Sequence, residues 1–203
     1  MSRLRKKTVK ATSDIAFNGM VLTIDGGVPR RITTDASDDS VPSRSKDGRW
    51  IYFASNRGGD QQVWKVPVES GEAVQVTKQG GFTTFESAGG KYLYYSKGSV
   101  SPGVWRIPVV GGEESLVLDQ PGAGSWGQWA LEDDGIYFIN LKSRGGPAIE
   151  FFSFERHEIR RIVGLESVNE FVSGLAISPD RRWILYTQQD PISSDIMLVE
   201  NFY

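Results

Sequence analysis

Cysteine is absent from this 203-residue chain, and histidine occurs only once, as His157. The lack of cysteine excludes disulfide frameworks, thiolate zinc sites and thiol catalysis. The single histidine excludes clusters of histidine ligands around a metal. No Gly-x-Ser-x-Gly elbow is present either, so a hydrolase nucleophile of that kind is missing. We therefore expect no metal and no cofactor.

Positive charge is not in excess, because 23 lysines and arginines stand against 25 aspartates and glutamates, a net charge of -2. A general nucleic-acid binder needs a dominant basic face to displace counterions, so we expect no direct nucleic-acid binding by this chain. No apolar run approaches the roughly 20 residues of a membrane helix. Residues 1–10 lack the apolar stretch of a secretory signal. The sequence does not distinguish between a cytoplasmic and a periplasmic location.

What the sequence does contain is a repeat. A short run of aromatic and β-branched residues recurs, and a turn with Asp or Gly precedes each copy. The central residues of the four runs follow one another at steps of 42, 43 and 48 residues and are Ile51, Leu93, Ile136 and Ile184. The last strands of the units keep a similar spacing, with Ile32, Val76, Val117 and Ile162 in register. Two independent landmarks thus agree on a period of about 43 residues.

Each unit contains three clear strands and a weaker one before the turn. No segment has apolar residues spaced i, i+3, i+4, i+7 over a helical length, which disfavours βαβ units. Four short antiparallel strands at this period are typical of a propeller blade. The predicted fold class is therefore all-β, a β-propeller of four-stranded antiparallel blades. It is either a small closed ring or an open fragment of a larger propeller.

At this period, residues 1–203 form a single domain of about four to five blades. Three predicted blades are complete, at about 38–78, 80–118 and 122–163, and two are partial, at about 5–36 and 170–203. Residues 5–9 resemble a last strand, which either completes the final blade and closes the ring or belongs to another blade. An open arc would leave two sheet edges that invite self-association.

Bulky rings recur in the third strand of the units. We expect Trp64, Trp105 and Phe152 to share one position there and to pack between adjacent blades. The alternative is a stacking surface for a sugar or nucleobase. Recurrence at equivalent positions favours the core.

Several segments carry a family resemblance. Trp50 to Gly59, which ends Ser55-Asn56-Arg57-Gly58-Gly59, and Val63 to Thr77 resemble the blade pattern of the TolB-like, WD-repeat-like β-propellers of bacteria. The similarity extends from about Gly19 to the C-terminus. It implies the C-terminal propeller of a signalling or transcriptional-regulator protein, next to a winged-helix DNA-binding domain or a kinase domain. Arg156-His157 replaces the family's Gly-Gly turn, which predicts a different turn type there.

The first strands of a propeller line its axial channel, so polar residues on them are candidate ligand contacts. The candidates are Arg44, Glu86, Trp126, Gln128 and Ser173. The plainer alternative is that these side chains bond to one another and to channel water. An acidic cluster of Asp35, Asp38 and Asp39 lacks the alternating spacing of a calcium loop, so we expect an ordinary solvated loop.

Two functions fit these residues. The favoured one is a non-catalytic module that binds a protein or peptide partner, or senses a ligand, with the output delivered by another domain. The alternative is a propeller-scaffold hydrolase or lyase that uses channel carboxylates such as Glu86. Such chemistry needs convergent histidine, carboxylate and metal groups. The chain has almost none of these, so we expect no enzymatic activity.

Overall fold

The computed structural model describes residues 18–21, 25–98, 101–166, 168, 174–189 and 194–200. Three of its sheets have four strands each. The first consists of β3 (Asp39–Arg44), β4 (Trp50–Ser55), β5 (Gln62–Pro67) and β6 (Val74–Gln75). The second consists of β7 (Thr84–Glu86), β8 (Tyr92–Ser96), β9 (Val104–Pro108) and β10 (Ser115–Leu118). The third consists of β11 (Trp129–Glu132), β12 (Gly135–Asn140), β13 (Ala148–Ser153) and β14 (Ile159–Gly164).

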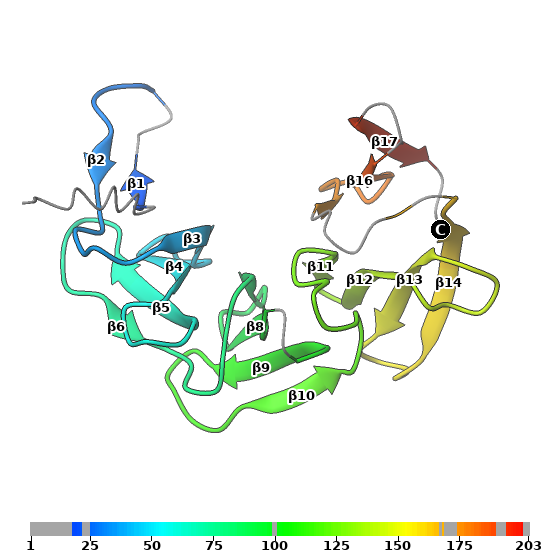
Figure 1. Cartoon of the computed structure of the whole chain (residues 1–203), viewed down its shortest axis with the longest axis horizontal. Coiled ribbons are helices and arrows are strands. Elements are labelled where there is room, and N and C mark those ends of the chain that lie inside the picture. The colour runs from blue at the N-terminus through cyan, green and yellow to red at the C-terminus, as the bar shows by residue number, and fades with distance from the viewer. Residues whose placement is uncertain are drawn as a thin grey trace, which may run out of the picture.

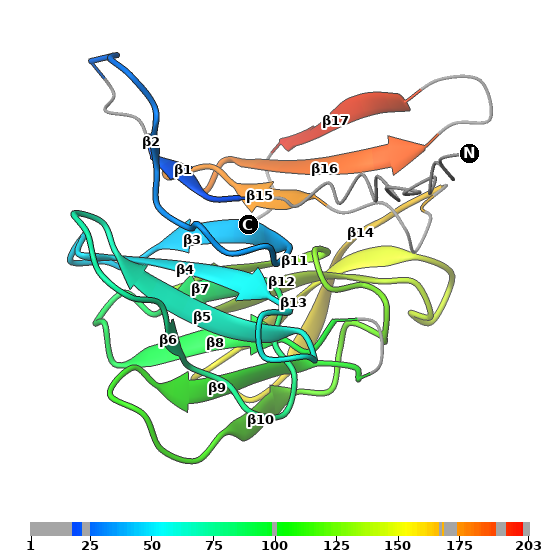
Figure 2. The ribbon, with the colours of Figure 1, turned by 60° about the vertical axis from the view of Figure 1, so that its left-hand side comes forward.

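Two smaller sheets lie at the ends of the described chain. One pairs β1 (Met20–Val21) with β2 (Arg30–Arg31), and the other consists of β15 (Leu175–Ile177), β16 (Trp183–Gln189) and β17 (Ser194–Glu200). Figure 2 shows β16 and β17 along their length. In all five sheets each strand pairs antiparallel with its neighbour in sequence, which confirms the predicted all-β propeller class.

The sheets follow one another along an open arc, with β1–β2 at one end and β15–β17 at the other (Figure 1). Within the described ranges no strand ladder joins these two end sheets. The arrangement therefore fits the open-fragment alternative and not the closed ring. Residues 5–9, which were expected to form a closing strand, lie outside the described residues. No helix in the described part of the chain is long and apolar enough to cross a membrane.

A serine builds the turn between the first two strands in the β3–β4, β7–β8 and β15–β16 connections, whereas the two-residue β11–β12 turn, Asp133-Asp134, has none. In the β3–β4 turn, the Ser45 hydroxyl accepts the Trp50 N–H at 2.9 Å. In the β15–β16 turn, the Ser178 hydroxyl accepts the Trp183 N–H at 3.0 Å. This side-chain hydrogen bond satisfies a backbone donor that the tight turn would leave unpaired, and it explains why the turn motif recurs in the sequence.

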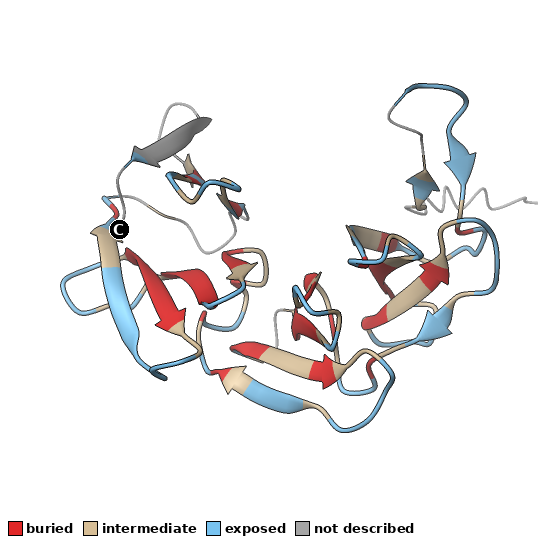
Figure 3. Cartoon of the chain, turned by 180° about the vertical axis from the view of Figure 1, so that it is seen from behind, coloured by how far each residue is buried: buried red, intermediate tan, exposed pale blue. Residues whose placement is uncertain are grey.

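The hydrophobic core consists of three layers, each between two neighbouring blades. The layer between the first and second four-stranded sheets contains Tyr52, Val63, Leu93, Tyr95 and Ile107. The next layer contains Tyr94, Val104, Leu118, Trp129, Ile136, Phe138 and Phe152. The third layer contains Ala130, Tyr137, Ile139, Ile149, Phe151, Leu165, Leu175, Ile184 and Tyr186. Figure 3 shows this burial in the middle strands, while much of the outer strands β10 and β14 is exposed.

The third-strand aromatics are only partly as predicted. Trp105 and Phe152 pack in the layers between blades, as expected. Trp64 and Trp105 share one register position, but the matching residue of β13 is Glu150, so the shared position of Phe152 is wrong. Phe152 lies two residues further along, on the same side of the sheet. The buried Glu150 accepts a hydrogen bond of 2.9 Å from the Asn140 amide.

The turn that replaces Gly-Gly differs, as predicted. In the β13–β14 turn, the His157 N–H bonds to the Ser153 carbonyl, four residues back, and His157 has a φ of 54°. In the β9–β10 turn, the Gly111 N–H bonds to the Pro108 carbonyl, three residues back. The β13–β14 turn is therefore one residue wider.

Replacing Leu93 by alanine should lower the free energy of unfolding by about 2–5 kcal/mol, because the cavity would lie between two blades. Leu93 is 0% exposed, whereas Leu116 on β10 is 50% exposed. The control Leu116→Ala should change the free energy by about 0.5 kcal/mol or less. Urea denaturation followed by circular dichroism measures both. Equal effects of the two substitutions would contradict a core between blades.

Candidate functional site

Two hollows border the second four-stranded sheet, on opposite faces of the arc. One face carries the β4–β5, β6–β7 and β10–β11 connections, and the other carries the β3–β4 and β7–β8 turns. The Trp126 cleft, on the first face, has a volume of about 660 Å³ and is lined by Asp60, Gln61, Gln62, Lys78, Gln79, Gly80, Gly81, Phe82, Lys97, Gly98 and Trp126. The Glu86 recess, on the second face, has a volume of about 330 Å³ and is lined by Ser45, Lys46, Asp47, Trp50, Tyr52, Glu86, Ala88, Gly89, Gly90 and Val109.

An aromatic pair forms one wall of the Trp126 cleft. The rings of Phe82 and Trp126 meet edge to face, with centroids 4.6 Å apart. The position of this wall is fixed by its backbone, since the Trp126 carbonyl accepts the Ser96 hydroxyl at 3.1 Å and the Trp129 indole N–H at 3.0 Å. The wall is thus held in place while Trp126 itself stays half-buried.

The polar groups at the base of the cleft are bonded to one another within the fold. The buried Lys97 ammonium forms an ion pair with Glu114 and lies 3.6 Å from the centre of the Trp105 ring. The Tyr95 hydroxyl donates to the same carboxylate. Burial, followed by the bond to Glu114, raises the pKa of Tyr95, so its phenol remains a donor.

The mouth of the cleft is different. Four polar side chains there make no hydrogen bond or ion pair to any other described residue, and they are Asp60, Gln61, Lys78 and Gln79. They stand beside the aromatic wall with their donors and acceptors available. This combination of apolar surface and unused polar groups can recognise a ligand.

The Glu86 recess contains a buried carboxylate. Glu86 is 8% exposed, and its Oε2 accepts the Tyr52 hydroxyl at 2.9 Å. Burial, followed by the hydrogen bond to Glu86, raises the pKa of Tyr52. The Tyr52 phenol therefore stays protonated and acts as a neutral donor to the carboxylate.

The structure places the predicted channel residues at separate points. Glu86 lies at the end of β7 in its recess, whereas Trp126 lies on the opposite face. Trp126 and Gln128 precede β11, which begins at Trp129, so neither is on a first strand as predicted. Gln128 is buried, Arg44 is exposed at the end of β3, and Ser173 lies outside the described residues. A shared channel site stays a prediction.

The acidic cluster is occupied by an arginine. The Arg57 guanidinium donates to both carboxylate oxygens of Asp39 at 2.9 Å and forms an ion pair with Asp35 at 2.8 Å. It also lies 5.2 Å from the centre of the Trp64 ring. The Asp39 side chain is 2% exposed. The expectation of a solvated loop is therefore wrong for Asp39, because its charge is buried against Arg57.

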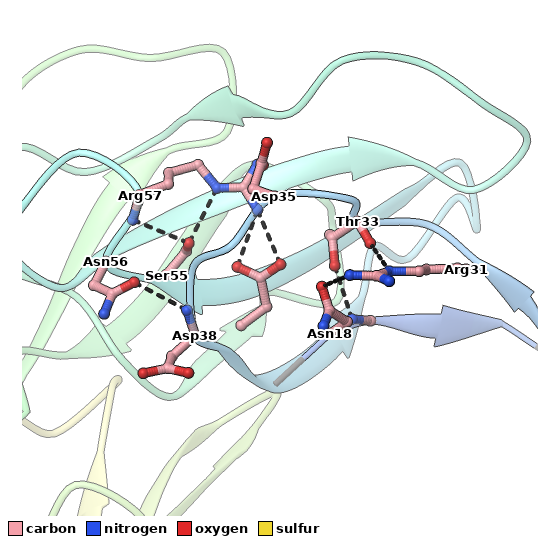
Figure 4. Close-up of polar contacts among 10 residues, drawn as sticks. Asn18, Arg31, Thr33, Asp35, Asp38, Ser55, Asn56 and Arg57 are labelled. Carbon is pink, nitrogen blue, oxygen red and sulfur yellow. Dashed lines mark hydrogen bonds and ion pairs between the residues drawn. The ribbon is translucent and has the colours of Figure 1, made fainter. Parts of the chain in front are cut away.

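Neighbouring polar contacts tie this loop to the β4–β5 connection. The Asp38 N–H donates to the Asn56 side chain at 3.0 Å, and the Arg57 Nε donates to the Ser55 hydroxyl at 3.0 Å (Figure 4). The Ser-Asn-Arg motif thus has a structural role at this end of the blade. In the described part of the chain, no group of three or more His, Cys, Asp or Glu residues is arranged to hold a metal ion.

Sequence reasoning missed several residues of the two hollows. Gln61 and Gln79 lie in connections outside the repeated strands, where no pattern singles them out. Tyr52 is one of several tyrosines at equivalent positions of the repeat, so the sequence does not distinguish it as the partner of Glu86. A comparison of Glu86 with its counterparts in later repeats would have marked it as unusual.

Comparison with known proteins shows the fold. No family model matches the chain. An uncharacterized protein of Agrobacterium fabrum is 39% identical over 64 residues, which are 32% of this chain and 22% of that protein. TolB from Acinetobacter baumannii is 13% identical with a TM-score of 0.68, over 89% of this chain and 45% of that chain. Oligogalacturonate lyase from Vibrio parahaemolyticus is 17% identical with a TM-score of 0.59, over 87% of this chain and 54% of that chain.

The chain therefore spans about half the length of these two solved propellers, and less of the curated relative. At these identities the likeness establishes a TolB-like β-propeller fold. Because one neighbour is named as a lyase and another as TolB, the fold is shared by proteins with different roles.

Addition of calcium chloride should leave the melting temperature unchanged, because the Arg57 guanidinium already pairs with the carboxylates of Asp35 and Asp39. Differential scanning fluorimetry with magnesium chloride at the same ionic strength provides the comparison. A rise in melting temperature with calcium alone would contradict this arrangement.

Proposed function

We propose that this chain is a non-catalytic binding module, and that its Trp126 cleft holds an extended peptide segment of a protein partner. The observation that supports the proposal is the set of polar side chains beside the Phe82–Trp126 wall that have no bonding partner in the described part of the chain. By contrast, the guanidinium of Arg57 is bonded to carboxylates within the fold.

The chemistry of the mouth suits a peptide. The side-chain amides of Gln61 and Gln79 each offer donors and an acceptor, as a peptide group does. Asp60 and Lys78 add one charge of each sign and would select the charges of the bound segment. The indole of Trp126 supplies a large apolar surface with little conformational entropy to lose.

The alternative, a hydrolase or lyase using Glu86, has less support. Catalysis by Glu86 would need further groups that converge on a reacting atom, such as a histidine or a metal ion. The described donor to Glu86 is the phenol of Tyr52, which stays protonated. The chain's one histidine, His157, lies in the β13–β14 turn of the next blade.

The proposal also includes the longer protein in which this module would act and its association with other chains. The motifs in residues 50–59 and 63–77 resemble TolB-like propellers, which supports a place in a longer signalling or transcriptional-regulator protein with its output in another domain. Association through the exposed sheet edges is a second means of contact with partners. The absence of direct nucleic-acid binding, expected from the net charge of -2, stays a prediction.

Peptides selected from a phage-displayed library on the native protein should bind at least about tenfold more weakly after Trp126→Ala, because such aromatic anchors dominate interface energetics. Gln79→Ala, at an exposed residue, should also weaken binding without touching the packing. Lys91→Ala, at an exposed residue on the opposite face, serves as the control. Fluorescence polarisation of labelled peptides gives the affinities.

Two results would overturn the proposal. Selected peptides that tolerate both Trp126→Ala and Gln79→Ala would place binding outside the cleft. Turnover in a broad screen of hydrolase and lyase substrates, abolished by Glu86→Gln, would show that the module is an enzyme.

A further inference from the structure

We propose that the Glu86 recess is a second binding site, which takes the ammonium or guanidinium group of a cationic ligand. The recess lies on the face opposite the Trp126 cleft, so this inference does not depend on the proposed function. It rests on a comparison of the blades, on the hydrogen bonding of Glu86 and on the lining of the recess.

The repeat shows that Glu86 stands at a position that the two following blades fill with an aliphatic residue, while the preceding blade has Arg44 there. In each blade this position pairs, across the first two strands, with the central residue of the aromatic run. The residues there in four successive blades are Arg44, Glu86, Leu131 and Ile177. Leu131 and Ile177 both pack in the apolar layers between blades. The second four-stranded sheet thus places a carboxylate where packing alone favours a hydrocarbon side chain.

The partner of this position is a tyrosine in each case. Tyr52, Tyr94 and Tyr137 are equivalent residues of β4, β8 and β12. Tyr94 lies in the same apolar layer as Leu131, and Tyr137 in the same layer as Ile177. Tyr52 instead meets the Glu86 carboxylate. An apolar residue at position 86 would complete this interface as it does the next two, so the carboxylate is not needed for packing.

The hydrogen bonding of Glu86 leaves its charge uncompensated. A buried carboxylate is costly unless it is paired with a cation or fully hydrogen-bonded. Within the described chain, Glu86 receives one hydrogen bond, from the neutral Tyr52 hydroxyl to Oε2, and forms no ion pair. Its Oε1 lies next to Gly90, where a Cβ atom would come within 3.2 Å. The missing side chain at Gly90 leaves this oxygen accessible from the recess.

The lining of the recess suits an organic cation rather than a metal ion. A calcium site needs several converging oxygen ligands, but the neighbouring Asp47 carboxylate already accepts the Ser45 hydroxyl and the Arg49 N–H. One carboxylate suits a charge-assisted hydrogen bond to an ammonium or guanidinium group. Trp50 and Val109 offer apolar surface for the alkyl stem of such a ligand.

Isothermal titration with n-butylguanidinium tests the site, with the neutral n-butylurea as the matched probe. Native protein should bind the guanidinium and not the urea. Glu86→Gln keeps the shape and removes the charge, and it should weaken binding at least about tenfold. Glu113→Gln, at an exposed glutamate, should leave binding unchanged. Trp126→Ala should also leave it unchanged, which separates this site from the peptide cleft.

Lys46 provides a further check, since its exposed ammonium lines the same recess. Lys46→Met removes a like charge and should strengthen guanidinium binding. The inference is overturned if n-butylguanidinium does not bind, if n-butylurea binds equally well, or if Glu86→Gln retains native affinity while circular dichroism shows a native fold.

Discussion

A four-stranded blade has two sheet faces to bury, and only the neighbouring blades can cover them. Alternate residues of the second strand therefore point to different neighbours, as Leu93 and Tyr95 pack toward one blade and Tyr94 toward the next. This constraint sets the repeat of about 43 residues in the sequence. It also confines the connections to the two faces of the arc, where both hollows lie.

Arg57 and Glu86 enter the spaces between blades in different ways. Arg57 does so near the β1–β2 end, where its guanidinium stacks on Trp64 and forms ion pairs with Asp35 and Asp39. Glu86 does so with one neutral donor among the described residues. In the first arrangement each charged group has an oppositely charged partner, and the fold explains it. The second is incomplete, which is why it points to a ligand.

The sequence was sufficient to predict the blades, because every blade needs the same apolar alternation and the same turn. It could not assign Phe152 correctly, since residues two apart lie on one side of a strand and both positions accept a large side chain. Glu86 and Trp126 were recognised as candidates, but their separation onto two faces depends on where β11 begins. The sequence could not predict the ion pair between Asp39 and Arg57 either, because several cationic side chains near the acidic loop could have formed it.

On this interpretation, Glu86 occupies an interblade position for binding and not for stability. The Tyr52→Phe/Glu86→Leu double variant replaces both partners of the hydrogen bond by apolar groups. Its free energy of unfolding therefore shows whether the pair stabilises the fold. Leu131 and Ile177 already fill the equivalent position in the next two interfaces. We expect the double variant to be as stable as the native protein or more stable. A loss of about 2 kcal/mol or more would show that the Tyr52–Glu86 pair is a structural element.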